Sequence, residues 1–405
     1  MRNNIKKRVA IVAPGFLPIP ALSGGAVEVL TTYILQHNEN FNDVEFIIFT
    51  PYHPELNKCK FKNTKIEAIY GEKAIKYKYL CKVVNWINRI TLKKVRFNPY
   101  EIELIWKIRN YEFDYIVIEN NMFFYDKIYE FTKYKNNLIY HMHNDIDGIS
   151  KTNNMAEKII NTAHKILVVS NYLKNRLLKI KECTKIEVLE NCIDFNNFIV
   201  GNQVRNMWRN KYNIKNTDLV LLYSGRINDD KGVKELVLAF KDASKQIKNL
   251  KLVVVGNSWF GNNNNDNYFD ELQEISLGVE SIIFTGFIKP DNIPNILAAA
   301  DIAIVPSKWE EPFGVVVLEA MAMKLPLIVT KSGGLIEIVD EKFSLIIERE
   351  NLIENLTNAI LNLANDEKKR EIMGENAGKA LYKNKKIYSH EYYYNNFITM
   401  AKIKK

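Results

Sequence analysis

The sequence predicts an α/β protein with two domains, each built on an open parallel sheet covered by helices. Three observations lead to this prediction. The chain has 405 residues, more than a single hydrophobic core usually serves. Short apolar runs of strand length alternate with helical segments in both halves, as in doubly wound folds. The composition, 47% hydrophobic and 25% charged residues, is that of a folded globular protein.

The expected strands are short apolar runs along both halves of the chain. The stretches that contain them, in some cases with the cap or turn that follows, are residues 8–14, 44–49, 115–118, 138–140, 165–171, 186–194, 219–226, 251–256, 281–286, 302–305 and 327–334. We place the boundary near residue 200, which gives an N-terminal domain of 1–200 and a C-terminal domain of 201–383. The tyrosine-rich end, 384–405, is expected to return as a helix and pack on the first domain.

The net charge indicates the class of binding partner, and the cysteines indicate the cellular compartment. The formal net charge of +9 favours anionic partners such as phosphates or an acidic membrane surface, and by itself gives no evidence of nucleic-acid binding. The four cysteines show no metal-ligand spacing, so we expect a reducing cytoplasm. The N-terminus carries no long apolar segment, and we predict neither a signal peptide nor a transmembrane helix.

The residues from Pro306 to Glu319 are the most informative stretch. They follow the expected strand 302–305, turn through a glutamate, a proline and a glycine, and continue into an apolar segment expected to be a helix. Pro312 suits the first helical position. A helix that begins beyond a parallel strand presents unpaired N–H groups and a positive dipole end, which bind anions or hydroxyl-rich ligands.

Glu311 and Glu319 are spaced to contact one elongated ligand. They lie about two helical turns apart, so each could hold a different part of it. An alternative stays open, in which Glu311 is an N-terminal helix acid and Glu319 is a solvated helix residue. Polar motifs elsewhere in the chain favour the binding-site interpretation.

Two cations stand beside glycines in the second half of the chain. Gly225 and Arg226 end the strand that begins at residue 219, and Lys231 and Gly232 precede the next helix. Two cations at such positions suit a diphosphate, because Arg can bind it bidentately and Lys supplies a compact point charge. As surface cations they would be unremarkable, and the neighbouring glycines favour the phosphate interpretation.

Glycine pairs follow two further strands. Gly24 and Gly25 would let backbone N–H groups approach a ligand before the expected helix 26–36. They do not form the GxGxxG dinucleotide fingerprint, and a plain tight turn would leave the same pattern. Residues 332–334 repeat the arrangement before an expected helix that contains Glu337, and they predict a further amide-rich anion site.

Two histidines close the expected strand 138–140. Alternation places His141 and His143 on one face, with His143 nearer the carboxyl end, where it could donate a hydrogen bond to a substrate. A structural histidine would look the same in the sequence. Asp145 and Asp147 form a possible divalent-metal pair, but helix capping explains them equally well and no third ligand stands out.

The segment 73–109 is rich in Lys and Arg. Ile75, Tyr79, Trp86 and Ile90 recur near helical spacing among these cations. Basic residues interleaved with aromatic ones can lie on an anionic bilayer surface. A domain helix with a solvated basic face is the other interpretation, and it stays open.

Together these motifs resemble the retaining GT-B glycosyltransferases of family 4, a group that includes bacterial polysaccharide and glycolipid synthesis enzymes. The resemblance covers nearly the whole chain, and the paired acids with Arg and Lys at this spacing are its strongest part. The motifs are Gly24-Gly25, Gly225-Arg226 with Lys231-Gly232, Glu311 to Glu319 with Pro312-Phe313-Gly314 between them, and Ser332-Gly333-Gly334 with Glu337.

The resemblance implies two Rossmann-like domains facing across a cleft, and a set of site residues. For donor binding these are Gly25, Gly225, Arg226, Lys231, Glu311, Phe313, Gly314, Val315 and Glu319; for catalysis they are His143, Arg226, Lys231 and Glu311. The two cations would neutralise the donor diphosphate, and Glu319 would hold the ribose hydroxyls. Glu311 and the amides of Phe313 and Gly314 would hold the transferred sugar, with His143 beside it.

The implied reaction is transfer of a hexose from a nucleotide sugar, a UDP-sugar on family frequency, to a cell-surface glycan or lipid-linked acceptor with retention of configuration. No metal, cofactor or nucleic acid is implied, and the expected location is the cytoplasm, peripheral at the inner face of the cell membrane. A nucleotide-sugar epimerase on the same plan is the alternative enzyme. A basic module that binds nucleic acid or membrane is the non-enzymatic alternative.

One position departs from the family pattern. The family often has Asn-Gly before Val/Ile-Asp where the two domains join, and this chain has Asn191-Cys192-Ile193-Asp194. Cysteine at 192 disfavours the positive-φ turn that glycine adopts easily, so the backbone is expected to differ there.

Overall fold

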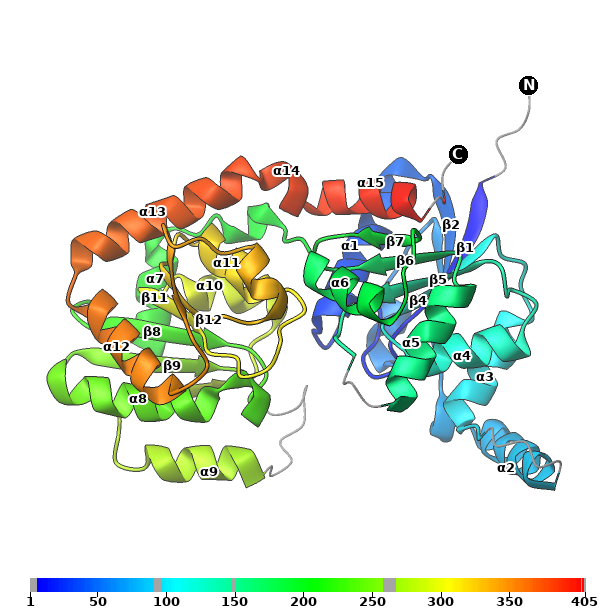
Figure 1. The fold of residues 1–405 in the computed structure, drawn as a ribbon, viewed down its shortest axis with the longest axis horizontal. Coiled ribbons are helices and arrows are strands. Elements are labelled where there is room, and N and C mark those ends of the chain that lie inside the picture. Colours follow the sequence, from blue (N-terminus) through cyan, green and yellow to red (C-terminus); the bar gives the residue numbers. More distant parts are fainter. Residues whose placement is uncertain (1–5, 91–95, 147–149, 258–266, 402, 404–405) are drawn as a thin grey trace. The chain divides into compact units, whose positions relative to one another are not determined.

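The chain forms two α/β units, as predicted. The computed structural model describes residues 6–90, 96–146, 150–257, 267–401 and 403. One unit comprises Met1–Glu190 together with His390–Lys405, and the other comprises Asn191–Ser389. Each unit holds one parallel sheet flanked by helices (Figure 1). Among the described helices, none combines the length and the apolar content needed to cross a membrane.

The first unit is organised around a seven-stranded sheet in the order β3-β2-β1-β4-β5-β6-β7. All neighbouring strands are parallel. The strands are β1 (Lys7–Val12), β2 (Val44–Pro51), β3 (Thr64–Ile69), β4 (Tyr115–Glu119), β5 (Leu138–Met142), β6 (Lys165–Val168) and β7 (Ile186–Val188). The central strands β1, β4 and β5 are largely buried on both faces, which explains their nearly continuous apolar runs.

Helices connect these strands. They are α1 (Ala26–Phe41), α2 (Ile75–Ile90), α3 (Pro99–Ile108), α4 (Met122–Phe131), α5 (Ser150–Thr162) and α6 (Asn171–Ile180), with short 3₁₀ turns η1 (Pro54–Lys58) and η2 (Gly71–Lys73). Helix α15 (His390–Met400) packs on α1, and the Tyr394 hydroxyl donates to Asn38 Oδ1 at 3.1 Å. The C-terminal segment therefore does return to the first unit, beginning at His390.

The second unit contains a six-stranded parallel sheet in the order β10-β9-β8-β11-β12-β13. Its strands are β8 (Leu219–Ser224), β9 (Leu250–Val255), β10 (Ile282–Gly286), β11 (Ile302–Val305), β12 (Leu327–Thr330) and β13 (Ser344–Ile347). Alternate residues of one strand face the same core, because side chains point to opposite sides in turn. Leu219, Leu221 and Tyr223 of β8 accordingly pack in one buried cluster.

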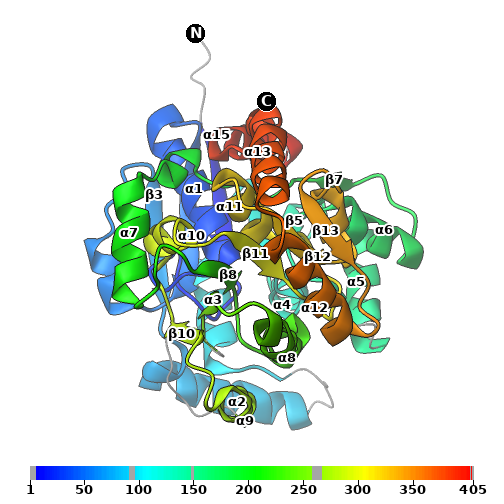
Figure 2. The ribbon, with the colours of Figure 1, turned by 90° about the vertical axis from the view of Figure 1, so that its left-hand side faces the viewer.

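The helices of this unit cover both faces of its sheet. They are α7 (Asn202–Lys211), α8 (Val233–Gln246), α9 (Asn267–Ser276), α10 (Ile293–Leu297), α11 (Val315–Ala322), α12 (Leu352–Ala364), α13 (Glu367–Lys383) and α14 (Lys385–Tyr388), with the 3₁₀ turns η3 (Phe195–Phe198), η4 (Asp229–Lys231), η5 (Pro290–Asn292) and η6 (Gly333–Glu337). Helices α8 and α12 lie side by side against the cluster around β8 (Figure 2).

The connector after β7 belongs to the second unit, so the division lies before residue 200. The Ile193 N–H donates to the Tyr388 carbonyl at 3.1 Å, and Ile193 forms a β-bridge with Ser389. Turn η3 also packs on α10 and α11, and α14 packs on α13, so 191–200 and 384–389 both group with the second unit. Cys192 is buried and does not adopt a positive φ, so its backbone needs no glycine.

Candidate functional site

Two loops of the second unit lie side by side because their parent strands are neighbours. Strands β8 and β11 pair in parallel, with Ile302 opposite Leu221, so the loops beyond their carboxyl ends meet at one edge of the sheet. A Cβ added to Gly232 would lie 2.0 Å from the Pro306 carbonyl oxygen, and φ there is 68°, so only glycine fits. The Asp230 carbonyl accepts the Lys308 N–H at 2.8 Å, which fixes one loop to the other.

Lys231 and Glu311 meet across these loops. The Lys231 Nζ lies 2.6 Å from Glu311 Oε1, and the same oxygen accepts a hydrogen bond from the Ser307 hydroxyl. Glu311 is only 7% exposed, and the Lys231 ammonium sits 4.9 Å from the centre of the Trp309 ring. A carboxylate this buried needs both a counter-ion and hydrogen bonds, and it has both.

The turn after β12 supports Glu311 from the other side. The Ser332 hydroxyl accepts the Glu311 N–H at 2.9 Å and donates to the Trp309 carbonyl at 2.6 Å. The Gly333 N–H donates to Glu310 Oε2 at 2.5 Å, and the Gly334 N–H donates to the Glu311 carbonyl at 2.6 Å. The prediction of an anion site at 332–334 is therefore wrong, because the amides of Gly333 and Gly334 already donate to the Glu310–Glu311 loop.

The local helical structure also differs from the expectation. Helix α11 begins at Val315, after Gly314 in the left-handed region with φ 104°, so Pro312 is not its first residue. The helix expected at Glu337 is the single 3₁₀ turn η6. Within the described part of the chain, the amides of Phe313, Gly314 and Val315 donate to no acceptor, so they remain available to a ligand.

Arg226 and Glu319 are the other two predicted groups of this edge. The Arg226 carbonyl accepts a hydrogen bond from the Tyr223 hydroxyl at 2.5 Å, and its guanidinium has no ion pair within the described ranges. Burial raises the Tyr223 pKa well above its usual range, and the Glu311 charge adds to the effect while Arg226 opposes it. Glu319 is partly buried in α11, and burial raises its pKa to about 7.

Gly225 lies where the ends of two strands approach closely. Its N–H donates to the Val255 carbonyl at 3.0 Å. A Cβ added to Gly256 would lie 1.9 Å from the Gly225 carbonyl oxygen. The second unit thus brings Gly225, Arg226, Lys231, Glu311, Phe313, Gly314, Val315 and Glu319 onto the loops and the helix that follow β8 and β11.

The remaining predicted residues, Gly25 and His143, belong to the first unit. Gly25 precedes α1 with φ 93°, and a Cβ there would lie 2.1 Å from Glu28 Oε2. Glu28 is 5% exposed; burial raises its pKa to about 7, and the Glu119 charge contributes. Gly25 therefore lets the first turn of α1 fold over a buried acid.

His143 lies beside a buried glutamate that the sequence analysis did not name. Its Nε2 is 3.0 Å from Glu119 Oε2, and His141 Nδ1 is 3.0 Å from the same oxygen. The two rings are 4.0 Å apart, so both histidines face one side of β5 as predicted. Burial opposes ionisation of Glu119, but the histidines outweigh it and lower its pKa to about 2. Burial, with the charge of His141, lowers the His143 pKa to about 4.

Asp145, one of the two aspartates suggested as metal ligands, binds protein donors instead. Asp145 Oδ1 accepts from Arg176 Nε at 3.0 Å, and its other oxygen accepts from the Tyr172 hydroxyl. Both oxygens of Asp145 are thus occupied by protein donors. Asp147 lies outside the described residues.

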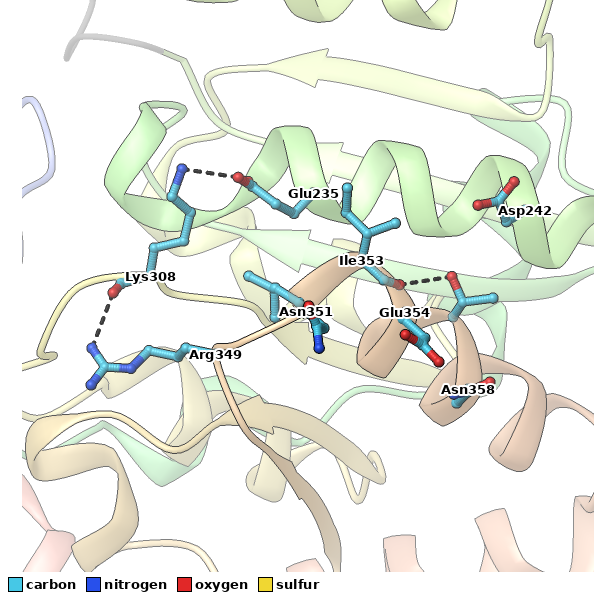
Figure 3. A pocket seen from close by; sticks show the side chains of 10 residues that line it. Glu235, Asp242, Lys308, Arg349, Asn351, Ile353, Glu354 and Asn358 are labelled. Carbon is cyan, nitrogen blue, oxygen red and sulfur yellow. Dashed lines mark hydrogen bonds and ion pairs between the residues drawn. The ribbon is translucent and has the colours of Figure 1, made fainter.

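A pocket of about 720 Å³ opens beside the loop that carries Glu311 (Figure 3). Lys308 lies at one end, bonded to Glu235 at 2.9 Å, and Arg349 donates to the Lys308 carbonyl at 3.0 Å. Its wall continues along α12 through Asn351 and Asn358. None of the ten described residues that line it is a predicted site residue, and its cations are already paired.

Sequence reasoning missed several supporting residues. Ser307 and Ser332 hold Glu311, yet a lone serine in a loop carries no signal until the loops are known to meet. Glu119 could have been found, because it follows the expected strand 115–118 as His141 follows the expected strand 138–140, and the two are register partners. Comparing the residues that directly follow neighbouring expected strands would have paired them.

Comparisons with known proteins agree with this architecture. A family model described as glycosyl transferases group 1 matches residues 204–380. A lipopolysaccharide 1,2-N-acetylglucosaminetransferase of Salmonella typhimurium is 30% identical over 348 residues, 83% of this chain and 83% of that protein. Spore coat protein SA of Bacillus subtilis is 24% identical over 91% of this chain and 93% of its own. Crystalline Anabaena Alr3699/HepE in complex with UDP and glucose shares the fold, with TM-score 0.75 and 18% identity over 98% of this chain and 99% of that one.

The pKa of Glu319 yields a prediction about stability. Because folding raises the pKa of Glu319, its carboxyl loses the proton at lower pH in the unfolded chain than in the folded one. The free energy of unfolding should therefore fall between pH 4.5 and about 7. Glu319→Gln should remove this loss and be ~1–2 kcal/mol more stable than wild type above that window, after discounting for partial exposure. Thermal melts across the pH range measure it.

Glu371→Gln, at an exposed position of α13, is the matched control and should leave the pH profile unchanged. Parallel pH profiles for wild type and Glu319→Gln would contradict the assignment of a buried, reluctantly ionised carboxyl.

Proposed function

This chain belongs to the family of glycosyl transferases group 1 and is a glycosyltransferase with the GT-B fold, and from that premise we propose that it moves a hexose from a UDP-sugar to a cell-surface glycan or lipid-linked acceptor with retention of configuration. The second unit is the donor domain in this proposal, and the first unit is the acceptor domain. The named acceptors and donors of the relatives support the proposal by similarity: a lipopolysaccharide transferase and a fold neighbour in complex with UDP and glucose.

The observation that supports the proposal most is the Lys231–Glu311 contact at 2.6 Å beside the free amides that open α11. A cation, a carboxylate and unpaired N–H groups are the groups that a sugar diphosphate needs. The ammonium suits the phosphates, and the carboxylate and the amides suit sugar hydroxyls, as an acceptor and as donors of hydrogen bonds. Lys231 and Glu311 are 80 positions apart in the sequence, and a turn with only a structural role does not require such a distant pair.

The proposed chemistry needs charge stabilisation at the leaving phosphate. The bond between the anomeric carbon and the β-phosphate oxygen breaks, and the acceptor oxygen bonds to that carbon from the same face. The acceptor proton passes to the departing phosphate. In this proposal Lys231 and the Arg226 guanidinium stabilise the negative charge that develops there, while Glu311 and the amides of Phe313 and Gly314 hold the transferred sugar. Glu319 would accept hydrogen bonds from the ribose.

Two residues of the first unit, His143 and Gly25, also have roles in the proposal. His143 is held by Glu119, and its backbone N–H donates to the Asn120 side chain at 2.9 Å, so its ring is fixed before substrate arrives. In the proposal it lies beside the reacting sugar, and the loop at Gly25 admits the acceptor or the diphosphate. The epimerase alternative gains no support from the comparisons.

An exposed apolar face on α2 favours attachment to an anionic membrane. Positions 75, 79, 83, 86 and 90 lie three or four residues apart and form one stripe, with Ile75 71% and Trp86 64% exposed. Tyr77 and Cys81 face the opposite way and pack against Phe97 and Ile102. Helix α2 extends away from the sheet beyond α3 (Figure 1), which leaves the stripe open within its unit.

Charge supports a bilayer as the surface that this stripe contacts. Lys78, Lys82 and Arg89 are exposed on the flank of the stripe. Aromatic and aliphatic side chains that enter the bilayer, flanked by long basic side chains, suit the headgroup region of an anionic leaflet. Residues 91–95, within the segment 73–109, lie outside the described residues. We propose that the protein is peripheral at the inner face of the cell membrane.

The donor site is tested by removing its ion pair. Lys231→Ala and Glu311→Ala should each lower kcat/KM for transfer by ~10²–10³-fold, because each group stabilises charge or holds the sugar where the bond breaks. Transfer is measured with UDP-sugars and a lipid-linked or glycan acceptor, with folding checked by circular dichroism.

Lys331→Ala is the matched control for this pair. Lys331 is adjacent in sequence to Ser332, but it is exposed and pairs with Glu348 at 2.9 Å, so its loss should leave turnover nearly unchanged. Normal turnover by both Lys231→Ala and Glu311→Ala would contradict the site. Analysis of the products without acceptor excludes epimerisation if the donor sugar is recovered unaltered.

Membrane attachment is tested by vesicle flotation. Each Lys near an anionic surface contributes ~1 kcal/mol, so Lys78→Glu with Lys82→Glu should weaken binding to anionic vesicles at least ~30-fold. The same reversal at Lys60 and Lys62, exposed residues between β2 and β3, is the control. Equal flotation of both double variants, or of Trp86→Ser and wild type, would contradict attachment through α2.

A further inference from the structure

Glu119, His141 and His143 form a buried cluster, and the proposed transfer reaction uses only the His143 ring of it. Glu119 is 0% exposed, His141 1% and His143 7%. One potential ligand atom from each lies within 4.8 Å of the others. The cluster brings together Glu119, the last residue of β4, its register partner His141 in β5 and His143 just beyond β5, so the sheet largely sets its geometry.

The polar groups of this cluster are incompletely satisfied by the protein. Both ring nitrogens of His141 and the Oε1 of Glu119 are buried without a hydrogen-bond partner among the described residues. His141 Nδ1 does lie 3.0 Å from Glu119 Oε2, but the atoms are not aligned for a hydrogen bond. Buried polar atoms normally have hydrogen-bond partners. Three unsatisfied polar atoms in one cluster therefore point to a ligand that would bind them.

The cluster also lacks a permanent positive charge. In the described part of the chain, Glu119 has no Lys or Arg partner, and its only ion-pair neighbours are the two imidazoles. A second buried acid, Glu28, lies near enough for its charge to interact with that of Glu119. A buried carboxylate is usually paired with a cation or coordinates one.

The backbone around the cluster is fixed in advance of any ligand. The Asn120 side chain accepts the His143 and Asn144 N–H groups, each at 2.9 Å. The Asn120 N–H donates to the His141 carbonyl at 2.8 Å, and Asn120 itself has φ 49°. Ligand positions locked by such bonds favour tight and selective coordination.

We propose that Glu119, His141 and His143 bind a divalent transition-metal ion, Zn²⁺ being the ion that this donor set suits. Two imidazole nitrogens and one carboxylate are ligands that zinc prefers, whereas Mg²⁺ and Ca²⁺ prefer oxygen. Ligand atoms around a tetrahedral zinc lie roughly 3.4 Å apart, so small ring movements suffice to close the site. Water or Glu119 Oε1 would take the fourth position.

This metal site is independent of the proposed donor chemistry. The sequence analysis predicts no metal, and this cluster departs from that expectation, while Arg226 and Lys231 would still balance the charge of the donor diphosphate. The metal would satisfy the orphaned atoms of the first unit and hold the His143 ring in place. Its test therefore measures metal content and affinity, and a failure there leaves the transferase proposal intact.

The experiment uses the full chain without a histidine tag. After chelator treatment and dialysis against Zn²⁺, elemental analysis should find one equivalent of zinc per chain. Added Co²⁺ should give the visible absorption band of a nitrogen-ligated, low-coordinate ion. Glu119→Gln and His141→Gln should each weaken Zn²⁺ binding by at least ~100-fold, because each removes a direct ligand. Glu119→Asp, which keeps the carboxylate, should recover part of the affinity.

His37→Gln is the matched control, because the chain offers a second histidine pair. His37 Nε2 and His390 Nδ1 are in contact in the same unit, but among the described residues the close cluster that includes a carboxylate is the one at Glu119. The control should bind zinc as wild type does. The proposal is overturned if wild type retains no zinc, or if His37→Gln loses the metal while folded Glu119→Gln and His141→Gln keep it.

Discussion

The ion pair between Lys231 and Glu311 is the contact on which the candidate site depends. It exists because β8 and β11 are adjacent in a parallel sheet, so the loops after their carboxyl ends must meet. Gly232 allows the two backbones to touch, and Ser307 and Ser332 complete the hydrogen bonding of the buried carboxylate. In the free protein each charge neutralises the other; a bound sugar diphosphate would offer the ammonium a second partner.

The sequence predicts the fold well because its signal is local. Buried parallel strands are continuous apolar runs, and the alternation with helices leaves few topologies to consider. The adjacency of β8 and β11 follows from the doubly wound order, so the convergence of Lys231 and Glu311 could be expected. The connector at 191–200 was harder to assign, because its place depends on the bridge between Ile193 and Ser389, which are far apart in the chain.

Details of the site were less predictable, since they depend on which partner each polar group finds. The amides at Gly333 and Gly334 look free in the sequence, but they bind the Glu310–Glu311 loop. Pro312 suggests a helix start, yet the left-handed Gly314 sets it at Val315. Glu119 has no motif of its own, and only its register with His141 reveals the buried cluster. Sequence periodicity carries no information about such pairings.

The central claim is that this edge of the second unit binds a nucleoside diphosphate through Lys231. The most direct measurement is isothermal titration of the full chain with UDP, GDP and ADP and with the matching monophosphates, on wild type and on Lys231→Ala. The account predicts that one diphosphate binds wild type more tightly than its monophosphate, and that the variant loses this difference. A diphosphate preference that survives in Lys231→Ala, or no diphosphate binding at all, would contradict it.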